Sequence, residues 1–129
     1  MSGLLSGILA VGLTGVTVVQ SGCLAVAAGV AAAGTVVYIR GELQASLANP
    51  YGDVISATGK AIEKLQFRKI SEKGDALKTV IVARTGSDKK IEITVKRVTD
   101  TLTKVEIRVG VFGDEALSMT VLDNIKQGL

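Results

Sequence analysis

The sequence predicts a two-layer α+β fold in which an antiparallel meander sheet carries two helices on one face, preceded by an apolar N-terminal signal or anchor segment. Three observations predict this fold class. All 15 Lys and Arg and all 12 Asp and Glu residues of the 129-residue chain lie in residues 40–129. In that part, apolar residues recur with period two in several stretches and with helical spacing in two others. Short turns favour antiparallel pairing, and a sheet with one apolar face needs both helices on that face.

The first strand is expected over residues 37–47, where alternation places apolar residues at Val37, Ile39, Gly41, Leu43, Ala45 and Leu47. A glycine inside a strand commonly marks a bulge, so Gly41 predicts a bulge. Asn49-Pro50 then opens a helix, because proline suits an early helical position and Asp53 stabilises the first turn. The buried face of this helix is expected to comprise Val54, Ile55, Thr58, Ala61, Ile62 and Leu65.

Four more strands are expected to follow as a meander. The first covers residues 66–72, where Phe67 and Ile70 do not alternate cleanly and so predict a bulge or an irregular edge. The second covers residues 77–85 and directs Ile81 and Ala83 inward. The last two place the following apolar residues on one face: Ile91, Ile93 and Val95, then Val105, Ile107, Val109 and Val111. Turns are expected at Lys73-Gly74-Asp75, Gly86-Ser87-Asp88 and Thr99-Asp100-Thr101.

The final helix is expected to start at Gly113-Asp114 and to bury Leu117, Val121, Leu122 and Ile125. We interpret the acidic pair Asp114-Glu115 as a helix cap whose negative charge interacts favourably with the helix dipole, not as a general acid–base pair. Gly110 and Gly113 on either side of Phe112 predict positive φ or a close backbone approach. Their spacing matches neither GxGxxG nor a P-loop, so it does not predict a phosphate cradle.

The composition excludes several kinds of chemistry. The chain has no His, no Trp and one Cys, which excludes an imidazole base, a Ser-His-Asp triad, a His-rich metal site and an internal disulfide. We therefore expect no enzyme activity, no cofactor and no metal. Aromatic residues are 3% of the chain and the net charge is +3, so we expect no nucleic-acid partner. The basic residues at Lys89-Lys90 and Lys96-Arg97 are either a solvated face or an attraction for anionic lipid; interspersed acidic residues favour the solvated face.

The first 39 residues carry no charge, so they cannot form a solvated linker and must lie in a membrane, contact a partner or be removed. As one helix they would be about 58 Å long, against a hydrocarbon core of roughly 30 Å. The segment therefore has to be divided. Ser21-Gly22-Cys23 looks like a bacterial lipobox, although Gln20 stands where an aliphatic residue is usual and no basic residue precedes the apolar run. The alternative is that Cys23 is a buried thiol in a membrane or core helix.

Several segments together resemble a family of small bacterial lipoproteins that is catalogued as a domain of unknown function. They are Ser21-Gly22-Cys23, the Ala/Gly run that follows it, YIRGEL at residues 38–43 and RVGVFGD at residues 108–114. The resemblance covers nearly the whole chain and implies a lipid-anchored periplasmic α+β domain. It implies no catalytic residue. It also implies outer-membrane sorting in preference to the inner membrane, because Leu24 and not Asp follows Cys23.

These features predict a signal peptide of the lipoprotein type over residues 1–22, a lipidated Cys23 with an apolar tether over residues 23–34, and the α+β domain over residues 35–129. The expected function is a non-catalytic structural or protein-interaction role in the cell envelope. The acylated Cys23 would bind the bilayer, and the domain would contact an envelope protein or its own copies. The alternative is an integral membrane subunit of a larger complex, with residues 3–39 retained as membrane helices.

Overall fold

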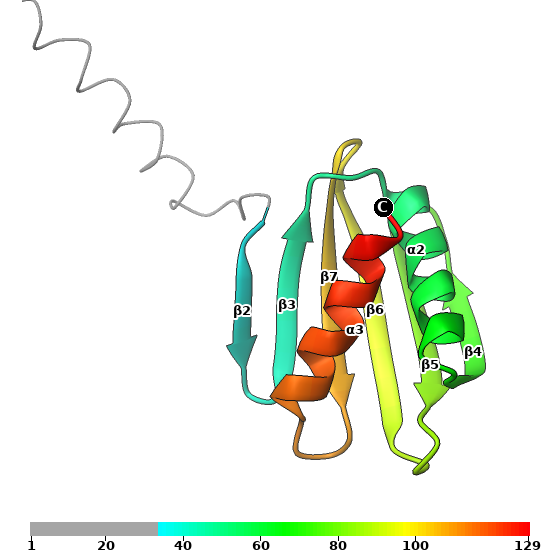
Figure 1. Cartoon of the computed structure of the whole chain (residues 1–129). Coiled ribbons are helices and arrows are strands. Elements are labelled where there is room, and N and C mark those ends of the chain that lie inside the picture. The colour runs from blue at the N-terminus through cyan, green and yellow to red at the C-terminus, as the bar shows by residue number, and fades with distance from the viewer. Residues whose placement is uncertain (1–33) are drawn as a thin grey trace, which may run out of the picture. The chain divides into compact units, whose positions relative to one another are not determined.

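Antiparallel strands form one twisted sheet in residues 34–129, which is the part of the chain that the computed structural model describes. The strands are β2 (Val36–Ile39), β3 (Glu42–Leu47), β4 (Arg68–Gly74), β5 (Lys78–Arg84), β6 (Lys90–Thr99) and β7 (Leu102–Val109). They lie in the order β2-β3-β7-β6-β5-β4. Helices α2 (Tyr51–Lys64) and α3 (Glu115–Gln127) both cover the same face of the sheet (Figure 1). The predicted fold class, a two-layer α+β domain with two helices on one face, is confirmed.

The hydrophobic core lies between the helices and the sheet face that they cover. Ile93, Ile107 and Val109, which the period of two directs inward, are each at most 1% exposed. Ile81 and Ala83 of β5 are fully buried, also as predicted. Helix α3 contributes Val121, Leu122 and Ile125 from the opposite side of the core. Complete burial of side chains of this size contributes about 1.5–3 kcal/mol each, so this layer provides most of the driving force for folding.

Helix α2 begins directly after Pro50, as the sequence predicted, and its buried side starts and ends about one turn earlier than expected. The buried residues are Tyr51, Val54, Ala57, Thr58, Ala61 and Ile62. Ile55 and Leu65, which we expected inside, are only partly buried and pack at the edge of the core. Tyr51 was missed because the expected face began at Val54, although Tyr51 lies three residues earlier, at helical spacing.

The N-terminal strand expected over residues 37–47 is wrong, because this segment is a β-hairpin. Ile39 pairs with Glu42 across the two-residue turn Arg40-Gly41. Both turn residues have positive φ, 54° at Arg40 and 81° at Gly41. A type I′ turn requires this, and its twist matches that of the flanking strands. The turn reverses which alternate residues face the core, and it directs Val37 and Ile39 to the face opposite the core. Because both of these residues are apolar, the sequence pattern still looks like one strand.

The same hairpin corrects the alternative in which residues 3–39 are membrane helices. Residues 36–39 are strand β2, and each of them pairs with a residue of β3. Tyr38 also packs against the core from this edge strand. One side of this segment's backbone is therefore bonded to β3, and the end of the proposed membrane segment belongs to the α+β domain.

The remaining strands follow the predicted pattern, but the turn expected at Lys73-Gly74-Asp75 lies later in the chain. Lys73 and Gly74 belong to β4 and pair with Val80 and Thr79, so the turn begins at Asp75. The register between β4 and β5 shifts between Lys69 and Ser71, which leaves Ile70 unpaired and 50% exposed and confirms the predicted bulge. Gly86-Ser87-Asp88 joins β5 to β6, and the Asp88 amide donates to the Thr85 carbonyl oxygen at 2.9 Å. The turn at residues 99–101 is also confirmed, because Thr99 pairs with Leu102.

The Gly34 end of the sheet, where the described chain begins, is closed by side chains that join α2 to the β4–β5 turn. The Tyr51 hydroxyl lies 2.8 Å from the Asp75 carbonyl oxygen and 2.7 Å from Thr79 Oγ1. The Arg97 guanidinium lies 5.0 Å from the centre of the Tyr51 ring. The Leu77 and Lys78 amides donate to the Asp75 carboxylate and lower the pKa of Asp75. Together these contacts fix the orientation of α2 on the sheet.

Replacement of Ile93 by Asp should unfold the domain, because it places a carboxylate without a partner in the centre of the core. The expected loss is several kcal/mol, enough to abolish a cooperative thermal transition in circular dichroism. Thr94→Asp is the matched control, since Thr94 is the next residue of β6 and faces away from the helices. A cooperative transition retained in Ile93→Asp at the temperature of the control would contradict the assignment of faces.

Candidate functional site

The predicted lipidation site lies outside the described residues. Cys23 and the lipobox residues Gln20, Ser21 and Gly22 all fall in residues 1–33, so their role remains a sequence-based prediction. The described part of the chain offers a different candidate, at the end of the sheet opposite Gly34 and on the sheet face that no helix covers.

Three connections meet at this second end, which we call the Phe112 end. They are the β2–β3 turn, the β5–β6 turn and the β7–α3 loop, and Figure 1 shows all three at the lower end of the sheet. A Cβ atom added to Gly113 would lie 2.5 Å from the Gly41 Cα and 2.5 Å from the Tyr38 hydroxyl oxygen. Arg108 donates from Nη2 to the Arg40 carbonyl oxygen at 3.2 Å. The hairpin and the loop therefore pack backbone against backbone, which only glycine permits.

The predicted backbone features around Phe112 are confirmed. Gly110 has φ of 69° and Gly113 has φ of 87°, and Gly113 makes the close approach to Gly41. The Gly110 amide donates to the Lys90 carbonyl oxygen at 2.8 Å, which ties the first residue of the loop to β6. Both ends of this short loop are thus fixed to the sheet.

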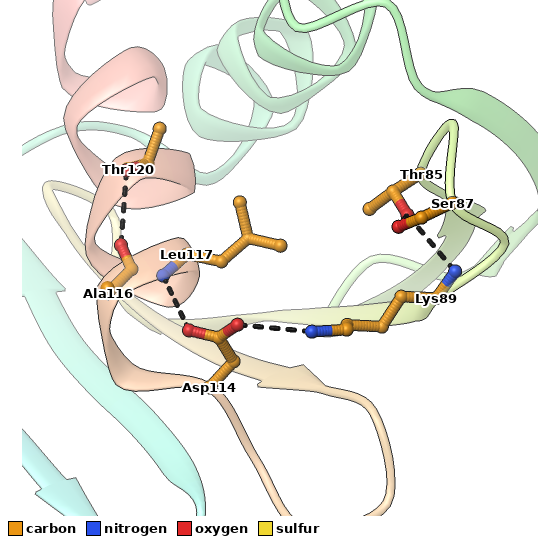
Figure 2. Close-up of polar contacts among 7 residues, drawn as sticks. All are labelled: Thr85, Ser87, Lys89, Asp114, Ala116, Leu117 and Thr120. Atoms are coloured by element: carbon orange, nitrogen blue, oxygen red, sulfur yellow. Dashed lines mark hydrogen bonds and ion pairs between the residues drawn. The ribbon is translucent and has the colours of Figure 1, made fainter.

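Asp114 caps α3 and links it to the β5–β6 turn (Figure 2). Its Oδ1 accepts from the Leu117 amide at 3.0 Å, and its Oδ2 lies 3.2 Å from Lys89 Nζ. The Lys89 amide in turn donates to Thr85 Oγ1 at 3.0 Å. The Leu117 amide and, after it, the Lys89 ammonium lower the pKa of Asp114. The predicted cap is confirmed, and Lys89 is used structurally.

The expectation that Val111 continues the apolar face of β7 is wrong. The strand ends at Val109, and positive φ at Gly110 turns the chain away from the core. Val111 is consequently 84% exposed and Phe112 is 93% exposed. The loop is fixed, yet it holds an aromatic side chain in solvent. Exposed apolar groups that lie together commonly mark contact sites. The Val111-Phe112 pair is therefore a candidate contact site.

An open hollow of about 610 Å³ lies between this loop and the uncovered sheet face. The loop supplies its apolar wall, and the strands supply charged side chains. Its lining consists of Arg84, Asp88, Lys89, Lys90, Glu92, Arg108, Gly110, Val111 and Phe112. Basic side chains from three neighbouring strands converge there beside an exposed aromatic residue. The sequence analysis missed this convergence because Arg84, Lys90 and Arg108 are far apart along the chain, and only the pairing of β5, β6 and β7 brings them together.

The uncovered sheet face, which we call the outer face, is strongly basic. Strand register assigns to it three acidic residues, Glu42, Glu92 and Glu106, and the eight basic residues Arg68, Lys73, Lys78, Arg84, Lys90, Lys96, Lys104 and Arg108. Because the chain has 15 basic and 12 acidic residues, seven basic and nine acidic residues remain for all other surfaces. The domain therefore carries a basic outer face, whereas its turns and its helix side taken together are slightly acidic.

The described residues offer neither a cluster of three or more candidate metal ligands nor a helix with the length and apolar character that a membrane crossing requires. What residues 34–129 present is a helix-covered sheet whose other face is charged, with one exposed aromatic loop at its rim. This arrangement defines a small two-layer α+β domain with one sheet face uncovered. The chain matches, over residues 7–128, the family described as "Protein of unknown function (DUF3568)", and it belongs to that family. A search among curated proteins gives no match.

Replacement of Gly113 by Ala should destabilise the domain, because the new methyl group would overlap the β2–β3 turn at a residue with positive φ. Overpacking and backbone strain each cost about 1–3 kcal/mol, and the effect is measurable as a lower midpoint in urea. Gly59→Ala is the control, since a Cβ at this helical position meets nothing within 4 Å. It should raise stability by about 0.5–1 kcal/mol. Equal effects of the two substitutions would refute the close contact.

The lowered pKa of Asp114 predicts a specific loss of stability in acid. The folded state holds the proton of Asp114 less tightly than the unfolded state, so this contribution is fully present above the ordinary value of 3.8. It is lost as the pH falls below that value through the folded pKa. Asp114→Asn retains a cap acceptor but removes the charge, so the stability difference from the parent should shrink in acid. Lys89→Gln should narrow that difference at neutral pH, because it removes one of the two interactions. A difference that is constant between pH 7 and pH 2 would contradict this account.

Proposed function

We propose that this chain is a membrane-anchored bacterial lipoprotein whose small non-catalytic domain has a structural or protein-interaction role in the cell envelope. Acylated Cys23 is the anchor, and residues 1–22 are a signal peptide that is removed. The domain lies on the periplasmic side, at the outer membrane in preference to the inner one. Its partners are the bilayer and an envelope protein or a second copy of the chain.

The observation that supports this proposal most strongly is the segregation of charge. Residues 1–39 have no charged residue, whereas residues 34–129 form a domain with its own hydrophobic core. The core includes buried residues from both helices and from four of the strands. An apolar segment before such a domain needs a non-aqueous environment or removal. Cys23, preceded by Ser21 and Gly22, divides that segment where a signal peptide of ordinary length would end.

The non-catalytic role is supported by the kind of surface that the domain presents. Its most distinctive features are the basic outer face and the exposed Val111-Phe112 pair. Both are surface features suited to contact with a large partner, because such contacts combine exposed apolar groups with a charged surround. The sequence also has no His and so lacks the most common general base.

Intact-mass spectrometry of the protein from native bacterial membranes tests the anchor. The expected mass lacks residues 1–22 and includes the added acyl groups, since stable attachment takes more than one acyl chain. Cys23→Ser is the matched control, and it should remain unprocessed with the mass of the full chain. A parent protein that starts at Met1 and has a free thiol would overturn the proposal in favour of a retained membrane segment.

A further inference from the structure

Basic side chains on the outer face form two rows that run across the strands. Lys78, Lys96 and Lys104 lie opposite one another on β5, β6 and β7, near the Gly34 end. The second row, near the Phe112 end, consists of Arg68, Arg84 and Lys90. At the rise of an antiparallel strand the two rows are about 20 Å apart. The outer face therefore presents positive charge at both of its ends.

Each row places basic side chains opposite one another on neighbouring strands. Like charges directly opposite one another on neighbouring strands destabilise a sheet. Within the first row, Lys96 Nζ lies 3.2 Å and Lys104 Nζ 3.5 Å from the same carboxylate, that of Glu106. In the second row, Arg68 Nη2 lies 3.9 Å and Arg84 Nη1 3.7 Å from Asp88 Oδ1. In each row one carboxylate therefore serves two of the three basic residues. Protection of a sheet edge does not explain the first row, because the edges of this sheet are β2 and β4.

The Val111-Phe112 pair adds an apolar group beside the second row. Both side chains line the same hollow as Arg84 and Lys90. The loop that carries them is held by the Gly113–Gly41 contact and by the bond from the Gly110 amide to Lys90. Phe112 is therefore presented in a fixed position, and little conformational entropy is lost when it contacts a partner.

We propose that the outer face docks on an anionic lipid surface, with the two basic rows against the headgroups and Phe112 at the headgroup–acyl boundary. A second copy of the chain is disfavoured, because it would place two faces with a net of five positive charges against each other. A nucleic acid is disfavoured because Glu42, Glu92 and Glu106 lie between the two rows. The basic residues therefore form no continuous track along which a phosphate backbone could bind. A flat anionic plane can contact both rows at once, and each basic residue near it is attracted to the lipid charge. The inference rests on the proposed function only in that an anchor keeps the domain near a bilayer.

A tryptophan at residue 112 can test this docking, because the chain contains no other tryptophan. The full chain carrying Phe112→Trp is reconstituted into vesicles of phosphatidylcholine alone or with phosphatidylglycerol. We expect a blue shift of the emission only with phosphatidylglycerol, and its reversal in about 1 M salt, where the screening length is near 3 Å. Met119→Trp, which reports from α3 on the helix side, should give no shift. No shift at residue 112, or an equal shift in both vesicles, would overturn the proposal.

Matched charge variants separate the outer face from net charge. In the Phe112→Trp background, Lys78→Gln, Lys96→Gln and Lys104→Gln together should lower the ratio of docked to free domain about a hundredfold. Glutamine can still donate to Glu106, so the sheet is preserved. The triple change Lys60→Gln, Lys64→Gln and Lys126→Gln alters the net charge equally on the exposed helix side and should have little effect.

Equal losses in the two triple variants would overturn the proposal. So would a shift that depends on protein density but not on lipid charge, which would assign the face to a second copy. The two proposals can fail separately. If intact mass shows that the native protein starts at Met1, and the lipid-dependent shift is still observed, the lipoprotein anchor is rejected while the docking is supported.

Discussion

The structure depends on a single constraint, which is that two helices cover only one face of the sheet. Every strand must then separate its side chains by face, with aliphatic groups toward α2 and α3 and polar groups outward. The buried residues of β6 and β7 satisfy this requirement with Ile, Val and Thr that are at most 1% exposed. The same alternation leaves the opposite face free to carry charge. The composition of the outer face is therefore not determined by folding, and it can serve contact with a partner.

The second organising contact is the backbone approach between Gly41 and Gly113. It joins the β2–β3 turn to the loop before α3. These two connections lie at the same end of the sheet but are far apart in the sequence. Asp114 follows immediately and starts α3 through its bond to the Leu117 amide. The position of the last helix, the exposure of Phe112 and the placement of the edge strand thus depend on one small region. The Gly34 end is held by polar bonds from Tyr51 and by the close approach of Gly74 to the backbone of Lys78 and Thr79.

Periodicity and turn residues predicted the fold class, both helices, the central strands, the bulge in β4 and the cap at Asp114. They failed at the Arg40-Gly41 turn, because the outward-facing Val37 and Ile39 are apolar and hide the change of face, and because arginine is not a residue that signals positive φ. They failed at Val111 for a related reason, since one glycine with positive φ redirects the chain without changing the apolar pattern. The candidate site could not be found from the sequence. Its basic residues come from separate strands, and only the observed register places Arg84 opposite Lys90 and Lys96 opposite Lys104.

The acidic residues that accompany the basic ones in the sequence show why register matters for electrostatics. Along β6, Lys90, Glu92 and Lys96 all point outward, which in sequence suggests a neutral, solvated face. Across the sheet, however, lysines stand opposite lysines and Glu92 stands opposite Arg108, so like charges gather into rows at the two ends. An anchor at Cys23 could not by itself orient these rows, because the chain from Cys23 to Gly34 can extend up to about 40 Å. Under the proposed lipid anchor, orientation at a membrane would have to come from the surface of the domain, and the two rows with Phe112 at their rim provide an asymmetric face suited to that role.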